Sequence, residues 1–278
     1  MSSRESLTKG VLSRWLVALV LIPPVAVAIF MANTLAILGV VGVLGAICWW
    51  EFAANLLGRE RVGLLALAIL GWLATAAGAL FYGPLGQALG LTAALALGAF
   101  YLMWALPAAE DRAAVNLIAR YGLGHMYISF LLSFAFLIKQ EHFGGRWLFF
   151  AVLATSLADT AAFYVGSWLK GPKLYPKVSP NKTISGLAGG CLAALAAGVL
   201  SFSYLPLEFP RASIAALSLG LALWGAVGDL FESALKRAMG LKDTSTLLLG
   251  HGGLWDRMDS ILFNLPAVYF YVSLQTAP

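Results

Sequence analysis

Apolar stretches of about 17 to 25 residues follow one another along almost the whole chain, and each is long enough to cross a bilayer as a helix. Only 11% of the 278 residues are charged and 60% are hydrophobic, whereas a soluble domain carries about a quarter charged residues. The stretches are too long for barrel strands, and a helix satisfies its own backbone groups within lipid. The sequence therefore predicts an all-α, polytopic integral membrane protein without a separate soluble domain.

The apolar stretches predict nine transmembrane helices. They are Leu12–Phe30, Thr34–Leu57, Val62–Tyr82, Leu85–Leu106, Leu117–Ile138, Trp147–Leu169, Ile184–Tyr204, Ala212–Lys236 and Asp256–Leu274. Most of the charged motifs fall in or after the sixth helix. We therefore expect residues 1–145, with helices one to five, to form a scaffold, and residues 146–278, with helices six to nine, to carry the site.

The basic residues are distributed very unevenly over the two sides of the predicted bundle. With the N-terminus in the cytoplasm, fifteen of the eighteen Lys and Arg residues lie inside, and only Lys139, Arg146 and Arg211 lie outside. This bias follows the positive-inside rule, and nine helices then put the C-terminus outside. The charged loops Lys170–Lys182 and Gly240–Trp255 are expected in the cytoplasm. The same segregation accounts for the net charge of +5 without a nucleic-acid partner.

The end of the eighth helix carries several polar side chains on one face. Asp229, Glu232, Ser233 and Lys236 follow the helical spacing i, i+3, i+4 and i+7. An acid within a membrane span usually has a task, so Asp229 is a candidate site residue. For Glu232, an ion pair with Lys236 is the preferred interpretation.

The start of the ninth helix is also rich in charge. Asp256 and Asp259 share one helical face, with Arg257 between them. Gly252 and Gly253 precede them, and backbone amides in such a loop can face a phosphate. Acids also stabilise helix N-termini, so capping is an alternative role for one of the two.

Two of these acids are candidates for a metal site. Asp229 and Asp256 lie on helices that are adjacent in sequence and run antiparallel. Mg²⁺ commonly takes one or two carboxylates together with substrate phosphates. We expect the two acids to meet around a divalent cation.

A second polar cluster starts in the sixth helix, where Asp159 interrupts an apolar stretch. Lys182 and Thr183 precede the seventh helix, and such residues at a helix start can bind an anion. We expect them to enclose one cytoplasm-facing pocket together with the region 236–259. A basic loop with a helix cap is the alternative for this cluster, and that alternative is sufficient to explain Lys170 and Lys173.

Two further polar residues are isolated in the predicted scaffold. Glu51 lies near the inner end of the second helix, and His125 lies in the fifth. Most buried polar groups in proteins have a hydrogen-bond partner. A structural role is therefore at least as good an explanation for both as a functional one.

The late motifs resemble a known family. The stretch Ser233-x-Leu-Lys236-Arg237-x4-Lys242-Asp243-x-Ser245, followed by His251-Gly252-Gly253-Leu-x-Asp256-Arg257-Met-Asp259, is similar to the signature of the bacterial phosphatidate cytidylyltransferases, or CDP-diacylglycerol synthases. Asp159, Tyr164, Ser179, Lys182 and Thr183 resemble a second motif of that family. The resemblance covers Asp159–Asp259 and departs at Leu249, where the family has a small residue or proline.

The resemblance implies a nucleotidyltransferase of phospholipid biosynthesis in the bacterial inner membrane, with its site facing the cytoplasm. It would convert CTP and phosphatidate into CDP-diacylglycerol and pyrophosphate with Mg²⁺. Whether a monovalent cation assists Mg²⁺ is left open. The implied catalytic residues are Asp229, Lys236, Arg237, Lys242, Asp243, His251, Asp256, Arg257 and Asp259, with Asp229 and Asp256 as metal ligands. The implied substrate-binding residues are Asp159, Tyr164, Ser179, Lys182, Thr183, Ser233, Gly252 and Gly253.

Other functions remain open at this point. A CTP-dependent lipid kinase, or a CDP-lipid synthase with another lipid acceptor, would use the same kinds of residue. An ion-coupled transporter could instead use Asp159 and Asp229 within the membrane. The sequence also leaves the oligomeric state open, a homodimer included.

Overall fold

The computed structural model describes residues 23, 25–27, 29–30, 34–58, 61–105, 111–248 and 252–276. Most of the predicted first helix, and with it the total of nine, lies outside these residues, as do Leu249 and His251. The chain divides into two compact units. The first unit is Met1–Phe136 with Asp243–Arg257, and the second is Leu137–Lys242 with Met258–Pro278.

The first unit contains the apolar helices α2 (Thr34–Leu56) and α3 (Val62–Ala105). At Gly83 the backbone of α3 turns to φ 64° and ψ −149°, directly before Pro84. A side chain strains this conformation, whereas glycine adopts it readily. The break divides α3 into the two predicted helices.

One further apolar helix follows, built from α4 (Asp111–Gly124), the π-helical turn η2 (His125–Phe130) and α5 (Leu131–Gln140). The turn places His125 in a polar contact inside the protein, with its Nδ1 3.0 Å from Ser129 Oγ. Ser129 Oγ also accepts a hydrogen bond from Trp49 Nε1 at 2.9 Å. These contacts support the structural role, one of the two roles that the sequence left open for His125.

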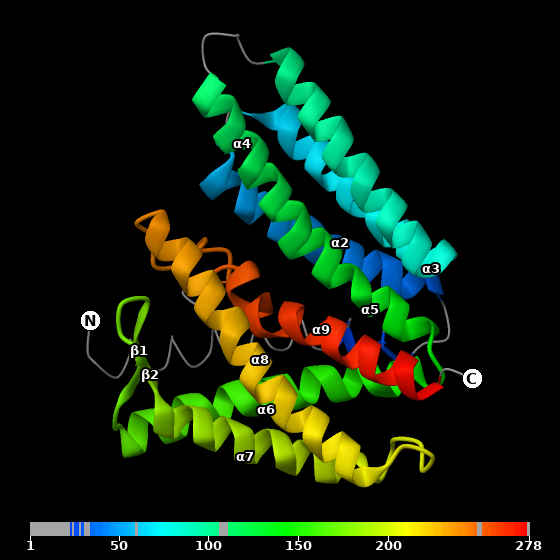
Figure 1. Ribbon diagram of the computed structural model, residues 1–278, viewed down its shortest axis with the longest axis vertical. Coiled ribbons are helices and arrows are strands. Elements are labelled where there is room, and N and C mark those ends of the chain that lie inside the picture. Colours follow the sequence, from blue (N-terminus) through cyan, green and yellow to red (C-terminus); the bar gives the residue numbers. More distant parts are fainter. Residues whose placement is uncertain are drawn as a thin grey trace. The chain divides into compact units, whose positions relative to one another are not determined.

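The second unit contains α6 (Gly144–Leu169), α7 (Ile184–Ser201), α8 (Arg211–Ala238) and most of α9 (Trp255–Thr276). Small residues let α6 and α7 approach closely: a methyl group on Gly190 would lie 3.0 Å from the carbonyl oxygen of Ala158. A short antiparallel hairpin of β1 (Lys173–Tyr175) and β2 (Ser179–Thr183) joins the two helices and lies at their shared end (Figure 1). The sequence did not predict this hairpin, which makes the fold almost, but not wholly, α-helical.

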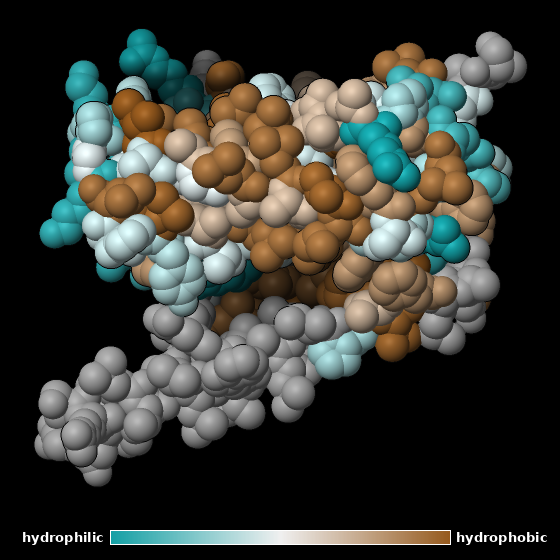
Figure 2. Space-filling view, turned by 90° about the horizontal axis from the view of Figure 1, so that it is seen from below, coloured by the Kyte–Doolittle hydropathy of each residue, from teal (hydrophilic) through white to brown (hydrophobic). Residues whose placement is uncertain are grey.

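Six helices among the described residues are long and apolar enough to cross a membrane. Their exposed side chains are often large and hydrophobic, as at Trp168, Leu192 and Leu223. Figure 2 shows hydrophobic residues gathered over the middle of one face and hydrophilic residues toward its ends, as expected where lipid tails meet the protein. The chain is a multi-pass membrane protein of helices. Among the described helices the observed ends lie within three residues of the predicted ones, except that the predicted fifth helix begins at Asp111, six residues before Leu117.

Candidate active site

The second unit encloses a cavity of about 470 Å³ at the hairpin end of α6, α7 and α8. Its polar lining consists of Asp159, Ser167, Lys170, Lys173, Asn181, Lys182, Thr183 and Asp229. Its apolar lining includes Phe163, Leu174, Leu187, Ala222 and Ala226. The cavity can therefore contact both the charged and the apolar parts of one molecule.

An ion pair crosses this cavity between β2 and α8. Lys182 Nζ lies 2.6 Å from Asp229 Oδ2, and both side chains remain partly exposed. The hairpin positions the lysine, because Thr183, its neighbour in β2, pairs with Lys173 in β1. Lys182 and Asp229, predicted from separate motifs, thus belong to one pocket.

Three acids of the second unit act on one another through their charges: Asp229 on Asp159, and both on Asp259. Ser260 connects two of them, since its Oγ donates to Asp159 Oδ1 at 3.2 Å and its backbone N–H donates to Asp259 Oδ1 at 2.7 Å. Gly228 lets α8 approach α9 here, because a methyl group on it would lie 2.6 Å from the Asp259 carbonyl oxygen. Like charges that interact in this way disfavour the charged form of each acid, and a bound cation would offset this repulsion.

No three His, Cys, Asp or Glu side chains of the described residues could hold a metal ion as a group. Mg²⁺ does not require such a group, because it keeps waters and takes substrate phosphates as ligands beside one or two carboxylates. The hard oxygen atoms of Asp159, Asp229 and Asp259 are of the kind that it prefers. Asp229 and Asp256 belong to different units, and their meeting around a cation stays a prediction.

The C-terminal end of α8 carries a second ion pair. Lys236 Nζ lies 3.0 Å from Glu232 Oε1, one helical turn away, and the Glu232 side chain is fully buried. This confirms the interpretation preferred for Glu232. Ser233 faces Asp229 instead, with its Oγ 3.5 Å from Asp229 Oδ1.

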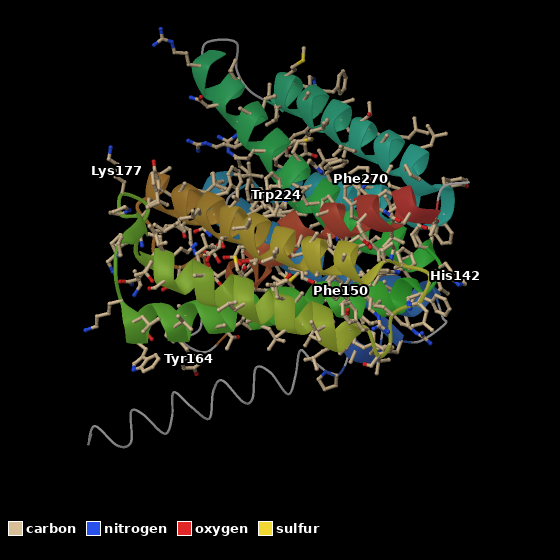
Figure 3. All side chains as sticks on the ribbon, turned by 60° about the horizontal axis from the view of Figure 1, so that its bottom comes forward. His142, Phe150, Tyr164, Lys177, Trp224 and Phe270 are labelled. Carbon is tan, nitrogen blue, oxygen red and sulfur yellow. The ribbon has the colours of Figure 1, made fainter. Side chains whose placement is uncertain are left out.

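Thr183 has a structural task at the start of α7. Its Oγ1 accepts a hydrogen bond from the Gly186 N–H at 3.1 Å, which caps the helix. Lys170 and Lys173 line the cavity beside it, a location that a merely basic loop does not require. Tyr164 does not line the cavity: its side chain is 62% exposed and points away from the helices in Figure 3.

The remaining predicted residues of this unit lie at its surface. Ser179 begins β2 opposite Tyr175. Arg237 donates to the Leu241 carbonyl oxygen at 3.1 Å, and Lys242 is exposed. These positions leave their predicted roles open.

In the first unit, Asp256 closes a tight loop. Its Oδ2 accepts hydrogen bonds from the Thr244 N–H at 2.9 Å, from Thr244 Oγ1 at 3.0 Å and from the Gly253 N–H at 2.7 Å. Gly252 has φ 76°, and a methyl group on it would lie 2.5 Å from the same oxygen. Asp243 and Arg257 flank the loop and are exposed.

Sequence reasoning missed the part that Glu51 plays in this loop. Its buried carboxylate accepts hydrogen bonds from Ser245 Oγ at 2.6 Å, the Leu254 N–H at 3.0 Å and the Trp255 N–H at 2.7 Å. The only signal was an acid in an otherwise apolar helix. Its partners lie about two hundred residues away, and nothing local to Glu51 identifies them.

The chain is similar over nearly its whole length to a known family. Residues 12–275 match the model of the cytidylyltransferase family. The phosphatidate cytidylyltransferase of Bacillus subtilis is 37% identical over 153 residues, 55% of this chain and 57% of that protein. Those of Staphylococcus saprophyticus and Staphylococcus aureus are 35% and 36% identical over 149 and 135 residues, which cover 54% and 49% of this chain and 54% and 52% of theirs. The matches thus span about half the length of these relatives, while the family match covers nearly all of this chain, which belongs to the cytidylyltransferase family.

Proposed function

We propose that this chain is a phosphatidate cytidylyltransferase, a nucleotidyltransferase that converts CTP and phosphatidate into CDP-diacylglycerol and pyrophosphate. The observation that carries the proposal is the cavity of the second unit, where lysines and carboxylates lie beside apolar walls among membrane-spanning helices. The relatives that are named phosphatidate cytidylyltransferases support the same substrates. Such a site lets a lipid react without its acyl chains leaving the bilayer.

The proposed reaction needs positioning more than it needs a base. A phosphate oxygen of phosphatidate attacks the α-phosphorus of CTP, and the bond from that phosphorus to the β-phosphate oxygen breaks. Pyrophosphate leaves with the electron pair. The attacking phosphate is already an anion, so the protein has to hold two charged molecules in line and offset their repulsion.

The lining of the cavity suits the lipid substrate. Lys182 can exchange the Asp229 carboxylate for a phosphate, because its flexible ammonium group is held by a single ion pair. Lys170 and Lys173 add positive charge nearby. Phe163 and Leu187 provide apolar surface for the start of an acyl chain.

Mg²⁺ is part of the proposal, with Asp229 and Asp256 as ligands and Asp159 and Asp259 in support. When bound, it would neutralise phosphate charge and stabilise the leaving pyrophosphate. The mutual repulsion of the three acids in the second unit is consistent with this assignment. Activity measured in potassium, sodium and choline salts would show whether a monovalent cation assists.

We further propose nine spans, a cytoplasmic N-terminus and a site facing the cytoplasm across a bacterial inner membrane, where CTP is present. The distribution of basic residues supports this orientation. A C-terminal reporter that is active only outside the cytoplasm would agree with an odd number of spans, and one active only inside would contradict it. The mass of the purified protein in detergent would show whether it is a homodimer.

The decisive experiment gives the purified protein phosphatidate, Mg²⁺ and CTP labelled either in the α- or in the γ-phosphate. We expect the α-label in the lipid and the γ-label in pyrophosphate. A lipid kinase would place the γ-label in a lipid, most readily with diacylglycerol as acceptor. Labelled product from another lipid phosphate alone would indicate a different acceptor. A transporter would label no lipid at all.

A further inference from the structure

The start of α9 is held by an acid from α2. The buried Glu51 carboxylate receives two consecutive backbone amides, those of Leu254 and Trp255, and the hydroxyl of Ser245. All four residues belong to the first unit. The first amides of a helix have no partner within the helix, and the helix dipole favours a negative charge beside them. Glu51 supplies both the acceptors and the charge.

Residues of α2 and of the loop before α9 fit closely around the Glu51 carboxylate. A methyl group on Gly253 would lie 2.5 Å from both carboxylate oxygens of Glu51, so only glycine leaves room for the acid. One helical turn after Glu51, Asn55 Nδ2 donates to the Thr244 carbonyl oxygen at 2.8 Å. The ring of Phe52 packs against that of Trp255 with centroids 5.2 Å apart. One face of α2 thus holds both ends of the segment 244–255.

The same segment holds Asp256. Three consecutive amides are shared between two acids: that of Gly253 donates to Asp256, and those of Leu254 and Trp255 donate to Glu51. Thr244 also belongs to this network, since its backbone N–H and its hydroxyl group both donate hydrogen bonds to the Asp256 carboxylate. A change in the acceptor at Glu51 therefore changes the backbone that orients the Asp256 carboxylate.

We propose that Glu51 is a positioning residue for the reaction. By holding Ser245, Leu254 and Trp255, it fixes the direction in which Asp256 points. This inference rests on the proposed function, because it gives Asp256 its task. Glu51 itself touches no substrate in this scheme. This role would involve α2 in the reaction, although the sequence predicts that α2 belongs to the scaffold.

The variant Glu51→Gln tests the proposal with the least change in shape. One oxygen becomes an NH₂ group that cannot accept a hydrogen bond, so an amide proton of Leu254 or Trp255, or the Ser245 hydroxyl, loses its acceptor. Hydrogen bonds to charged groups are among the stronger ones in proteins. Thr75→Val is the matched control, because it removes an equally buried hydrogen bond, to the Gly71 carbonyl oxygen, elsewhere in the first unit.

The first measurement is hydrogen–deuterium exchange in metal-free protein. We expect the amides of 244–248 and 252–255 to exchange about tenfold faster or more in Glu51→Gln, with no change there in Thr75→Val. The second measurement is the Mg²⁺ dependence of turnover. Glu51→Gln should need about tenfold more Mg²⁺ for half-maximal activity, and Glu51→Asp, which keeps the charge on a shorter side chain, should fall between it and the unchanged protein.

The outcomes separate this inference from the function on which it rests. If the unchanged protein forms no CDP-lipid, the proposed function fails, and the exchange data still show whether Glu51 holds the backbone before Asp256. If it forms CDP-lipid and Glu51→Gln keeps both its exchange and its Mg²⁺ dependence, the positioning role is wrong. Faster exchange with unchanged turnover and Mg²⁺ dependence would also overturn the positioning role, since the hydrogen bonds of Glu51 would then be structural only. Should Glu51→Gln fail to fold, Ser245→Ala removes one of its three donors and should shift both measurements in the same direction.

Discussion

Asp229 and Asp256 are predicted to share one task, yet the two units of the protein treat them differently. Asp229 faces a cavity and a lysine side chain. Asp256 faces two backbone amides and a hydroxyl group in a tight loop. A lysine ammonium can move to another anion, whereas amides within a folded loop cannot. The comparison teaches that an acid can have a partner that is able to move to a substrate, as at Asp229, or partners that fix its orientation, as at Asp256. A site for charged substrates can use both.

The largest effects are expected from replacing either acid by its amide. Asp229→Asn and Asp256→Asn should each lower turnover by about a thousandfold or more while the protein still inserts and folds, because each loses a proposed Mg²⁺ ligand. Turnover is measured with labelled CTP at saturating Mg²⁺. Glu208→Gln is the control, because it neutralises an exposed acid of the second unit that does not line the cavity.

The same two variants sharpen the comparison when the amides of 244–248 and 252–255 are followed by hydrogen–deuterium exchange. Asp256→Asn should speed their exchange, since its amide accepts hydrogen bonds less strongly than a carboxylate. Asp229→Asn should leave them unchanged. Near-normal turnover in either folded variant would remove that acid from the metal site.

The next largest effect is expected at Lys182, the partner of Asp229. Lys182→Ala should lower turnover about a hundredfold, because a positive charge aimed at a phosphate is lost. The defect should vary little with salt, since a charge in a pocket is poorly screened. Lys177→Ala is the matched control: Lys177 is an exposed lysine in the same hairpin connection and points away from the helices (Figure 3). An equal defect in both variants would leave Lys182 as an ordinary basic residue of the loop.

A smaller effect is expected where the Asp256 loop meets Glu51. In Gly253→Ala the added methyl group would collide with the Glu51 carboxylate and with the Thr244 hydroxyl group. Overpacking of this kind costs about 1–3 kcal/mol, and we expect turnover to fall roughly tenfold through the loop. Phosphatidate binding in the cavity, followed separately with a non-reactive nucleotide, should be retained. Loss of lipid binding as well would contradict separate roles for the two regions.

The helices could be predicted closely because their signal is local. Each span is a continuous apolar stretch, and the Gly83–Pro84 pair marks the break in α3 within the sequence itself. The hairpin between α6 and α7 has no such signal, because its strands are three and five residues long and largely polar. Its presence decides which lysines face the cavity.

The site could be predicted in part, for the same reason. Asp159, Lys182 and Asp229 stand out as charges in or beside apolar helices, and the structure brings them to one cavity. Glu51 stands out equally, but its task depends on amides that any residue could supply. Backbone partners leave no trace in the side-chain pattern, so this contact required the structure.

The smallest effect is expected at Thr183, which both caps α7 and lines the cavity. As the N-cap of α7 it should contribute about 1 kcal/mol to stability, so Thr183→Ala should lower the melting temperature slightly and Thr183→Ser should not. Turnover at a temperature where both variants are folded should stay within about threefold of the unchanged protein, because less than 1 kcal/mol of transition-state stabilisation is at stake. Its location on the cavity lining allows a stricter test. If Thr183→Ala reduces turnover as much as Lys182→Ala while its melting temperature is unchanged, its hydroxyl group binds substrate, and the cavity holds its ligand through α7 as well as through the ion pair with α8.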